Sequence, residues 1–591
     1  MANNLDARAE GAGILLEPRW PGAPPVPNAT KEALLAALGD PMEETAAEPF
    51  PGQAFVPPVV DERRLFGVSL QLYQLRSHRN LGSGDLGDLR SLIDGFAREG
   101  CDFIGLNPLH ALFTAAPERA SPFSPSDRRF LNPLIIAVDA VPGYRPQMRE
   151  GVSVPGSGDQ VDYTAAARAK LIVLRRVHAT WRTGGPDITQ GDIQAAARHR
   201  SEAGNELEDF ALFEALSHAM VRDGCMAGWT GWPAQYRTRE GAAVRAFREA
   251  HANDIAFFAW LQYVAASQLD AAQAHARRSG MAIGLYLDLA VGSAPDGAAT
   301  WADPGLVMAH LRVGAPPDLF SAQGQNWGLA PLSPTALRRE AFASHKAVLG
   351  AVMEAAGAVR IDHVMGVERL YLIPEGASAL DGAYVKMDGQ LRSLLGASQA
   401  HETLVIGEDL GVVPAGFRDR MAARRIFSTR IVPFERDGEV MRALETYPAD
   451  SLACFSTHDL APLEAWWLGE DILVRRSLGL LSGATLTQAE NERNAERRLV
   501  LALAGLDETA LHGPPDSEIA VAIHRLAARS ASRLAAIRLE DVVGGRRLVN
   551  LPGTDREHPN WRNTLPMDVD EIGRSERLSR VFAAMREGRS G

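Results

Sequence analysis

The chain of 591 residues has little cysteine and no long hydrophobic run. Its three cysteines, Cys101, Cys225 and Cys454, are too few for a disulfide framework and form no CxxC metal pair. Sparse cysteine is typical of a reducing compartment. No stretch approaches the roughly 18 apolar residues that a membrane-spanning helix needs, and the first residues do not form a secretory signal. We therefore expect a cytoplasmic protein without a membrane partner.

The sequence also lacks an excess of positive charge. It carries 61 basic and 73 acidic residues, which gives a formal net charge of −12. Such a chain has no broad electrostatic attraction for polyanions, so nucleic acid is not an expected partner. The hydrophobic share of 46% is enough for a large core. A neutral substrate is compatible with these numbers.

Proline-rich segments occur near the N-terminus. Two of them, at 17–27 and 49–58, flank one helical candidate at 30–38. Proline stiffens such segments and removes backbone hydrogen-bond donors. We interpret residues 1–60 as an extension that lies on the main domain rather than as an independent fold.

From Asp61 onward, short apolar runs alternate with longer helix-like stretches. Near-continuous apolar strands are typical of a parallel sheet buried on both faces, and helices between them give βα units. The sequence therefore predicts an α/β fold, a (β/α)8 TIM barrel over residues 61–575, followed by a C-terminal tail at 576–591. The eight predicted strand regions are 65–73, 101–110, 280–290, 357–366, 404–411, 428–435, 452–460 and 533–541.

The spacing of these regions is uneven. About 170 residues separate the second and third, against a few tens in a plain βα unit. We expect a mainly helical insertion at about 137–279, which also holds the aromatic segment 228–236. The gap at about 461–532 predicts a second helical insertion. Both are expected to form subdomains at the C-terminal face of the barrel.

Acidic residues follow several predicted strands: Asp288, Asp362, Glu408 and the pair His458–Asp459. The C-terminal ends of all strands in such a barrel meet at one mouth, so these side chains should lie together. Glycosidic chemistry needs one carboxylate at the anomeric carbon and a second, protonated carboxyl group for the leaving oxygen. Arg360 lies two residues before Asp362, so both point the same way on a strand, and its charge would keep Asp362 ionised.

Two other interpretations fit these acids. A single acid after a strand is often a helix cap or a solvated loop residue, although three on successive strands weaken that explanation. Histidine and carboxylate side chains at strand ends are also good metal ligands. The pattern alone therefore leaves a metal-dependent hydrolase open.

Longer motifs around these residues carry a family resemblance. RIDHVMGVERLYLIP (360–374), IGEDLGVVP (406–414) and STHDLAPLEAWW (456–467) resemble the 4-α-glucanotransferases (amylomaltases), glycoside hydrolase family 77 of the α-amylase clan. Further blocks in the family's order extend the resemblance over roughly residues 65–565. These blocks lie at 75–89, 121–136, 284–304, 314–334 and 550–562.

The resemblance implies roles at matching positions. Asp362 corresponds to the nucleophile, Glu408 to the general acid/base, and Asp459 to the third acid, which binds sugar hydroxyls and favours the distorted ring of the transition state. Arg360 and His458 correspond to invariant partners in the donor subsite.

Further substrate-binding positions follow from the same resemblance. Asp288 matches the first motif of the clan, Asn550 belongs to the C-terminal signature, and Trp327 lies in a loop that covers glucan in the family. The family usually has tyrosine where this chain has Phe123, which keeps an aromatic face but lacks the hydroxyl donor. Trp466–Trp467 are expected to pack on a helix rather than bind sugar.

The resemblance implies a retaining 4-α-glucanotransferase that moves α-1,4-glucan segments from a donor maltodextrin to the 4-hydroxyl of glucose or a maltodextrin. Its expected partners are α-1,4-glucans, maltodextrins and glucose, and the chemistry requires no cofactor and no metal. Maltose use and glycogen turnover both remain open as its pathway. Two alternatives stay beside this function: an α-glucan hydrolase of the same clan, and a catalytically idle glucan-binding protein.

Overall fold

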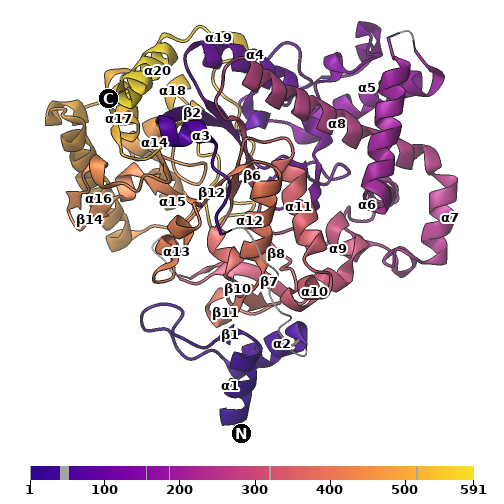
Figure 1. The fold of residues 1–591 in the computed structure, drawn as a ribbon, viewed down its shortest axis with the longest axis horizontal. Coiled ribbons are helices and arrows are strands. Elements are labelled where there is room, and N and C mark those ends of the chain that lie inside the picture. The colour runs from indigo at the N-terminus through magenta and orange to yellow at the C-terminus, as the bar shows by residue number, and fades with distance from the viewer. Residues whose placement is uncertain are drawn as a thin grey trace.

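Eight parallel strands close a barrel at the centre of the computed structural model, and helices surround it (Figure 1). Every predicted strand region overlaps one of these strands, so the predicted (β/α)8 barrel is confirmed. The structure describes residues 2–39 and 52–590, except 155, 157, 186, 318–320, 322, 514 and 516. In order around the barrel, the strands are β2 (Leu65–Leu70), β3 (Phe103–Leu106), β6 (Gly284–Leu289), β9 (Ala358–Ile361), β12 (Leu404–Gly407), β13 (Phe427–Ile431), β16 (Ser451–Cys454) and β17 (Leu534–Arg538).

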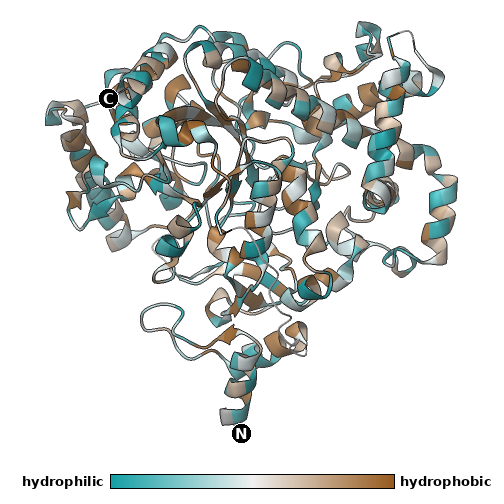
Figure 2. Cartoon of the chain, in the orientation of Figure 1, coloured by the Kyte–Doolittle hydropathy of each residue, from teal (hydrophilic) through white to brown (hydrophobic). Residues whose placement is uncertain are grey.

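Alternation along the strands separates the barrel interior from its helix-covered outside. On β9, Ala358 lies in the inner apolar cluster, while Val359 and Ile361 belong to the cluster shared with the surrounding helices. The same period of two continues toward the mouth, so Arg360 and then Asp362 point inward. Figure 2 shows hydrophobic strands at the centre and helices of mixed hydropathy around them.

Helices cover the outside of the barrel. α4 begins with a capping box in which Asp85 and Asp88 exchange hydrogen bonds with each other's backbone. The last helix packs along α17 and buries Val581 and Phe582, so the segment predicted as a tail belongs to the helical layer. These helices are α4 (Leu86–Arg98), α8 (Ala252–Arg278), α11 (Ala343–Met353), α12 (Gln390–Ala400), α13 (Phe417–Ala423), α14 (Leu463–Leu468), α17 (Ser517–Arg529), α18 (Leu539–Val543) and α20 (Glu576–Arg589).

Helices also fill the two regions predicted as insertions. α6 bends at Gly204, whose φ of 55° lies in the left-handed region that glycine adopts without strain. α8, at the end of the first region, packs along α4 and against β6. The domain boundaries themselves remain a prediction. Besides α8, the helices of the first region are α5 (Tyr163–Thr183), α6 (Gln190–Arg222) and α7 (Ala242–Ala250). Besides α14 and α17, the second region holds α15 (Glu470–Ser477) and α16 (Gly483–Ala504).

A five-stranded antiparallel sheet lies beside the barrel, and the sequence did not predict it. Its strands are short and come from segments far apart in the chain, so no local pattern indicates their pairing. In spatial order they are β1 (Ile14–Leu15), β11 (Ala383–Lys386), β10 (Arg369–Pro374), β7 (Leu311–Ala315) and β8 (Gln325–Leu329).

The N-terminal segment lies on this sheet, at the lower end of the molecule in Figure 1. Besides the pairing of β1 with β11, Arg19 donates hydrogen bonds to the carbonyl oxygens of Leu380 and Gly382. The prediction of a single helix here was wrong, because two more are present; residues 40–51 of the segment lie outside the described residues. The helices are α1 (Ala2–Gly11), α2 (Asn28–Leu38) and α3 (Pro58–Glu62).

Two further findings concern membrane-length helices and the cysteines. Across the described ranges, no helix combines the length and the apolar character that crossing a membrane takes. Cys101, Cys225 and Cys454 are all free thiols, and the first and last of them are buried.

Candidate active site

The predicted polar site residues gather at the C-terminal mouth of the barrel. Parallel strands all end at this face, so residues distant in sequence meet there. Their positions are Asp288 on β6, Arg360 on β9, Asp362 directly after β9, Glu408 directly after β12, His458 and Asp459 after β16, and Asn550 after α18.

One nitrogen of Arg360 joins two carboxylates. Nη1 donates to both oxygens of Asp288, at 2.8 and 2.9 Å, and lies 3.0 Å from Oδ1 of Asp362. The parallel register of β6 and β9 pairs Asp288 with Arg360. The two side chains are only 6% and 11% exposed, so little water screens their attraction. The position of Asp288 therefore fixes the guanidinium that contacts Asp362.

Burial and the Arg360 charge act in opposite directions on the pKa values of Asp288 and Asp362. Burial raises the pKa of Asp288 to about 6, with Arg360 lowering the pKa and the Asp362 charge raising it. Burial also raises the pKa of Asp362 above its ordinary value, while Arg360 and His458 lower the pKa and Asp459 raises it. Arg360 thus favours the Asp362 carboxylate as predicted, but burial outweighs its effect.

Glu408 is held by backbone donors from two loops. The N–H of His363 donates to Oε2 at 3.0 Å, and the N–H of Leu410 donates to Oε1 at 2.7 Å. His363 has a φ of 47°, in the left-handed region that non-glycine residues seldom adopt. Burial raises the pKa of Glu408 to about 7; Arg360 acts against this rise, and the Asp362 charge adds to it.

Asp459 forms the outer edge of the acidic cluster. Its side chain is 41% exposed, against 20% for Asp362. His458 Nε2 lies 3.2 Å from Oδ2, and Asn550 Nδ2 donates to Oδ1 at 2.7 Å. Surrounding protein atoms disfavour the charged form of Asp459, but His458 and Asn550 outweigh them and hold its pKa well below its usual range. Asp459 therefore stays ionised when Glu408 is protonated.

Aromatic rings lie beside the acids. Phe123 stacks on His458, with ring centroids 4.8 Å apart, and Trp561 lies 5.3 Å from Phe123. Trp327 on β8 meets His363 edge-on at 5.1 Å. These rings give the polar mouth apolar surfaces of the kind that line small-molecule sites.

Sequence reasoning missed three contributors to this mouth. The N–H groups of His363 and Leu410 have no side-chain signal, because any residue but proline supplies one. Trp561 lies inside the block 550–562, where its aromatic character was an available signal. Trp466–Trp467 pack on α14 as expected, at 8% and 0% exposure.

The charges at the mouth are balanced mainly by other side chains. The guanidinium of Arg360 lies between Asp288 and Asp362 and contacts both carboxylates. Throughout the part of the chain that the structure describes, no group of three or more His, Cys, Asp or Glu side chains is arranged to hold a metal ion.

Several known proteins resemble this chain over most of its length. The sequence model of the 4-alpha-glucanotransferase family, glycoside hydrolase family 77, matches residues 70–568. The 4-alpha-glucanotransferase of Haemophilus influenzae is 35% identical over 569 residues, covering 91% of this chain and 81% of that protein. The Mycobacterium tuberculosis enzyme of the same description is 35% identical over 578 residues, covering 93% and 78%. The crystal structure of amylomaltase from Corynebacterium glutamicum is 28% identical, with a TM-score of 0.79, and the match covers 91% of this chain and 77% of that one.

Proposed function

This chain belongs to the 4-alpha-glucanotransferase family, glycoside hydrolase family 77, and from that premise we propose that it transfers α-1,4-glucan segments from a donor maltodextrin to the 4-hydroxyl of glucose or of another maltodextrin. One observation carries the proposal. At the mouth of the barrel, Asp362 lies against the Arg360 guanidinium, while the neighbouring Glu408 has a pKa of about 7. A retaining glycosyl transfer needs one carboxyl group that attacks as the anion and one that donates a proton, and we assign these roles to Asp362 and Glu408.

In the first half of the proposed reaction, Glu408 protonates the glycosidic oxygen and Asp362 attacks the anomeric carbon. The reducing-end fragment leaves, and a covalent glycosyl ester forms on Asp362. The raised pKa of Glu408 supports its role as the acid, because the group holds its proton near neutral pH. Arg360 supports the carboxylate form of Asp362 that attack requires.

In the second half, Glu408 takes the proton of an acceptor 4-hydroxyl. That oxygen attacks the anomeric carbon, the bond to Asp362 breaks, and an α-linkage is restored after two inversions. The backbone N–H groups of His363 and Leu410 support this step, because they stabilise the carboxylate that Glu408 must become. Transfer exceeds hydrolysis where a sugar occupies the acceptor position and water is kept out.

The remaining residues are proposed to bind substrate. Asp459 stays ionised and has an exposed edge, so it can accept hydrogen bonds from sugar hydroxyls and stabilise positive charge on the ring. His458 and Asn550 hold it in place. Phe123 and Trp327 offer apolar faces against which sugar rings can pack.

The proposed substrates are maltodextrins and glucose, as maltose use or glycogen turnover would supply them. We place the protein in the cytoplasm, because its three cysteines are free thiols and free thiols are typical of a reducing compartment.

Incubation with maltotriose tests the proposed function. Transfer produces glucose together with chains longer than maltotriose, and the Asp362→Asn variant should produce neither. Glucose and maltose alone would identify a hydrolase, and unchanged maltotriose would identify a glucan-binding protein. The same incubation with excess EDTA should give the same products, and their loss would revive the metal-dependent hydrolase.

A further inference from the structure

Two buried basic side chains form hydrogen bonds with the backbone just after Asp288. His110 Nε2 lies 3.3 Å from the backbone N of Ala290 and accepts its hydrogen bond. Arg128 Nη1 donates to the carbonyl oxygens of Ala290 and Val291, at 2.9 and 3.1 Å. The backbone donor and acceptor of one residue, two positions beyond Asp288, are thus held from the same side.

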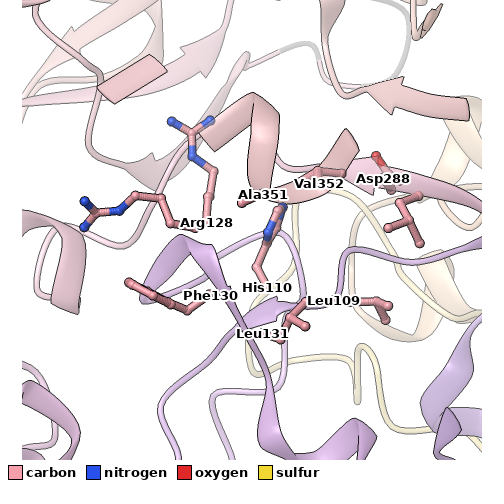
Figure 3. Close-up of a pocket in the computed structure, with 10 residues that line it drawn as sticks. Leu109, His110, Arg128, Phe130, Leu131, Asp288, Ala351 and Val352 are labelled. Atoms are coloured by element: carbon pink, nitrogen blue, oxygen red, sulfur yellow. The ribbon is translucent and has the colours of Figure 1, made fainter. Parts of the chain in front are cut away.

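Both basic side chains come from one antiparallel pair of strands outside the barrel, β4 (His110–Ala111) and β5 (Asp127–Leu131). They are almost completely buried, at 3% and 7% exposure for His110 and Arg128. Figure 3 shows both lining one pocket with Asp288 and with Ala351 and Val352 of α11. The pair of strands therefore contacts the chain directly after the C-terminal end of β6.

The protonation of His110 follows from this contact. Because Nε2 accepts a hydrogen bond, the ring must carry its proton on Nδ1 and stay neutral. Burial, together with the nearby Arg128 charge, lowers the pKa of His110 to about 3. The acceptor is therefore kept at neutral and mildly acidic pH.

Arg128 is costly for the fold to bury. Among the described residues its hydrogen bonds go to carbonyl oxygens rather than to a carboxylate, and its buried Nε has no partner. Burial lowers the pKa of Arg128 to about 10. The charge of Asp127 opposes this shift, but no described carboxylate contacts Arg128 directly. A buried cation without a direct ionic contact destabilises a fold, so its position calls for a role beyond stability.

We propose that His110 and Arg128 are positioning residues for the transfer reaction: they fix the end of β6, and thereby set Asp288, Arg360 and the nucleophile Asp362 in line. The proposal rests on the function proposed above. The chain of contacts is continuous, from the strand pair β4–β5 to Ala290, from Asp288 to Arg360, and from Arg360 to Asp362. Neither His110 nor Arg128 touches substrate in this scheme.

The pH profile of kcat/KM reports this alignment. Arg360 lowers the pKa of Asp362, so a displaced Arg360 leaves Asp362 with a higher pKa. On the acid side of the profile, kcat/KM falls as Asp362 becomes protonated. This acid limb then moves to higher pH. The other charged groups that act on Asp362 are Asp288, His458, Asp459 and Glu408, and the substitutions below alter none of them.

Two matched pairs of variants test the proposal with maltotriose as donor. His110→Leu removes the acceptor, and we expect kcat to fall by about 10- to 100-fold with an upward shift of the acid limb. His110→Gln places an amide oxygen near the position of Nε2 and should keep most of the rate and the wild-type limb. Arg128→Met should behave like the leucine variant, and Arg128→Lys, which can still donate to the carbonyls, should recover part of the rate.

His345→Leu is the control for general damage. His345 is also buried, on α11, and its Nδ1 has no partner among the described residues. Its loss should change thermal stability by a similar amount without moving the acid limb. Circular dichroism gives the folded fraction of each variant, so that kcat refers to folded enzyme.

The outcomes separate the two proposals. Wild-type acid limbs in every variant, with rates that fall only in step with the folded fraction, would overturn the positioning role while transfer itself stands. Equal losses in His110→Leu and His110→Gln would overturn it as well. A wild-type enzyme that forms no chain longer than maltotriose would instead overturn the proposed function.

Discussion

Asp85 and Asp88, at the start of α4, are more deeply buried than Asp362 and Asp459 at the barrel mouth, and their oxygens are occupied by hydrogen-bond donors. Asp88 accepts hydrogen bonds from Ser77, Arg79, Asn80 and the backbone N–H of Asp85. We call Asp85, Asp88, Arg79 and the fully buried Lys170 the α4 cap cluster. Its charges join the barrel helix α4 to the helix α5, which carries Lys170.

At the mouth, the oxygens of Asp362 and Glu408 accept fewer hydrogen bonds than those of Asp88. Asp362 has the single Arg360 contact among the described residues, and Glu408 has one backbone N–H on each oxygen. In the α4 cap cluster, by contrast, Lys170 lies 3.5 Å from Asp85 and also donates to the carbonyls of Leu134 and Ile136. Buried acids therefore have two uses in this molecule. Acids whose oxygens are filled with hydrogen bonds hold elements together, and acids with few hydrogen bonds keep lone pairs and protons available for reaction.

The largest expected difference between the two clusters is in activity. Asp362→Asn and Glu408→Gln should each lower the maltotriose transfer rate by about 10³-fold or more, because each removes a reacting group. Their thermal unfolding midpoints should stay at or above that of the wild type, because each substitution removes a buried acid with a raised pKa. A large loss of stability in either variant would show that the mouth acids also hold the fold.

The α4 cap cluster should give the opposite result. Lys170→Met leaves Asp85 without one of its cationic partners in a site that is 1% exposed, which should cost about 3 kcal/mol of unfolding free energy. The kcat of the folded enzyme should change by less than about twofold, because α5 contributes no reacting group. Chemical denaturation and maltotriose kinetics measure the two quantities.

An exposed ion pair serves as the control for Lys170→Met. Arg547 pairs with Asp159 on the surface, where both side chains are more than half exposed. Arg547→Met should leave the denaturation midpoint unchanged within error, because water screens such pairs. A similar loss of unfolding free energy in Lys170→Met and Arg547→Met would show that burial of the α4 cap cluster adds nothing to the effect.

The raised pKa of Glu408 predicts a pH dependence of stability. Its pKa is about 7 in the folded protein against 4.5 for an ordinary glutamate, so the folded state keeps a proton that the unfolded state releases in between. The stabilisation from this bound proton is complete below pH about 4.5 and is lost as the pH rises to about 7, which lowers the unfolding free energy by up to about 3 kcal/mol. Glu408→Gln cannot ionise, so its stability relative to the wild type should rise from pH about 4.5 to 7 and then level off. Parallel curves for the two proteins would contradict the assigned pKa.

The smallest expected effect is at Phe123. Its ring already stacks on His458, and Phe123→Tyr adds only a hydroxyl at the edge of the site. One additional hydrogen bond to sugar should raise kcat/KM for maltotriose by about 2- to 10-fold, without changing the unfolding midpoint. A lower kcat/KM would show that the mouth is shaped around phenylalanine.

Much of this molecule could be predicted from the sequence. The barrel strands are continuous apolar runs with polar ends, a local pattern, and the mouth acids sit directly at those ends. The five-stranded sheet could not be predicted, because Ile14 pairs with Val385 across most of the chain. The hydrogen bond from the Ala290 N–H to His110 could not be predicted either, because a backbone N–H carries no residue identity.

The pKa of Asp362 shows the same limit. Its spacing from Arg360 predicted the ion pair, and the pair is present. Burial, which raises the pKa against the effect of Arg360, depends on the whole packed barrel and not on two neighbouring positions.

Trapping the covalent intermediate tests the central claim most directly. In the Glu408→Gln variant, α-maltosyl fluoride can still react, because fluoride leaves without a proton, while the release of the sugar lacks its base. Mass spectrometry of the intact protein and of its peptides should find one maltosyl group, attached to Asp362. Fluoride release with the sugar on another residue, or with no adduct and with inversion at the anomeric carbon, would contradict the account.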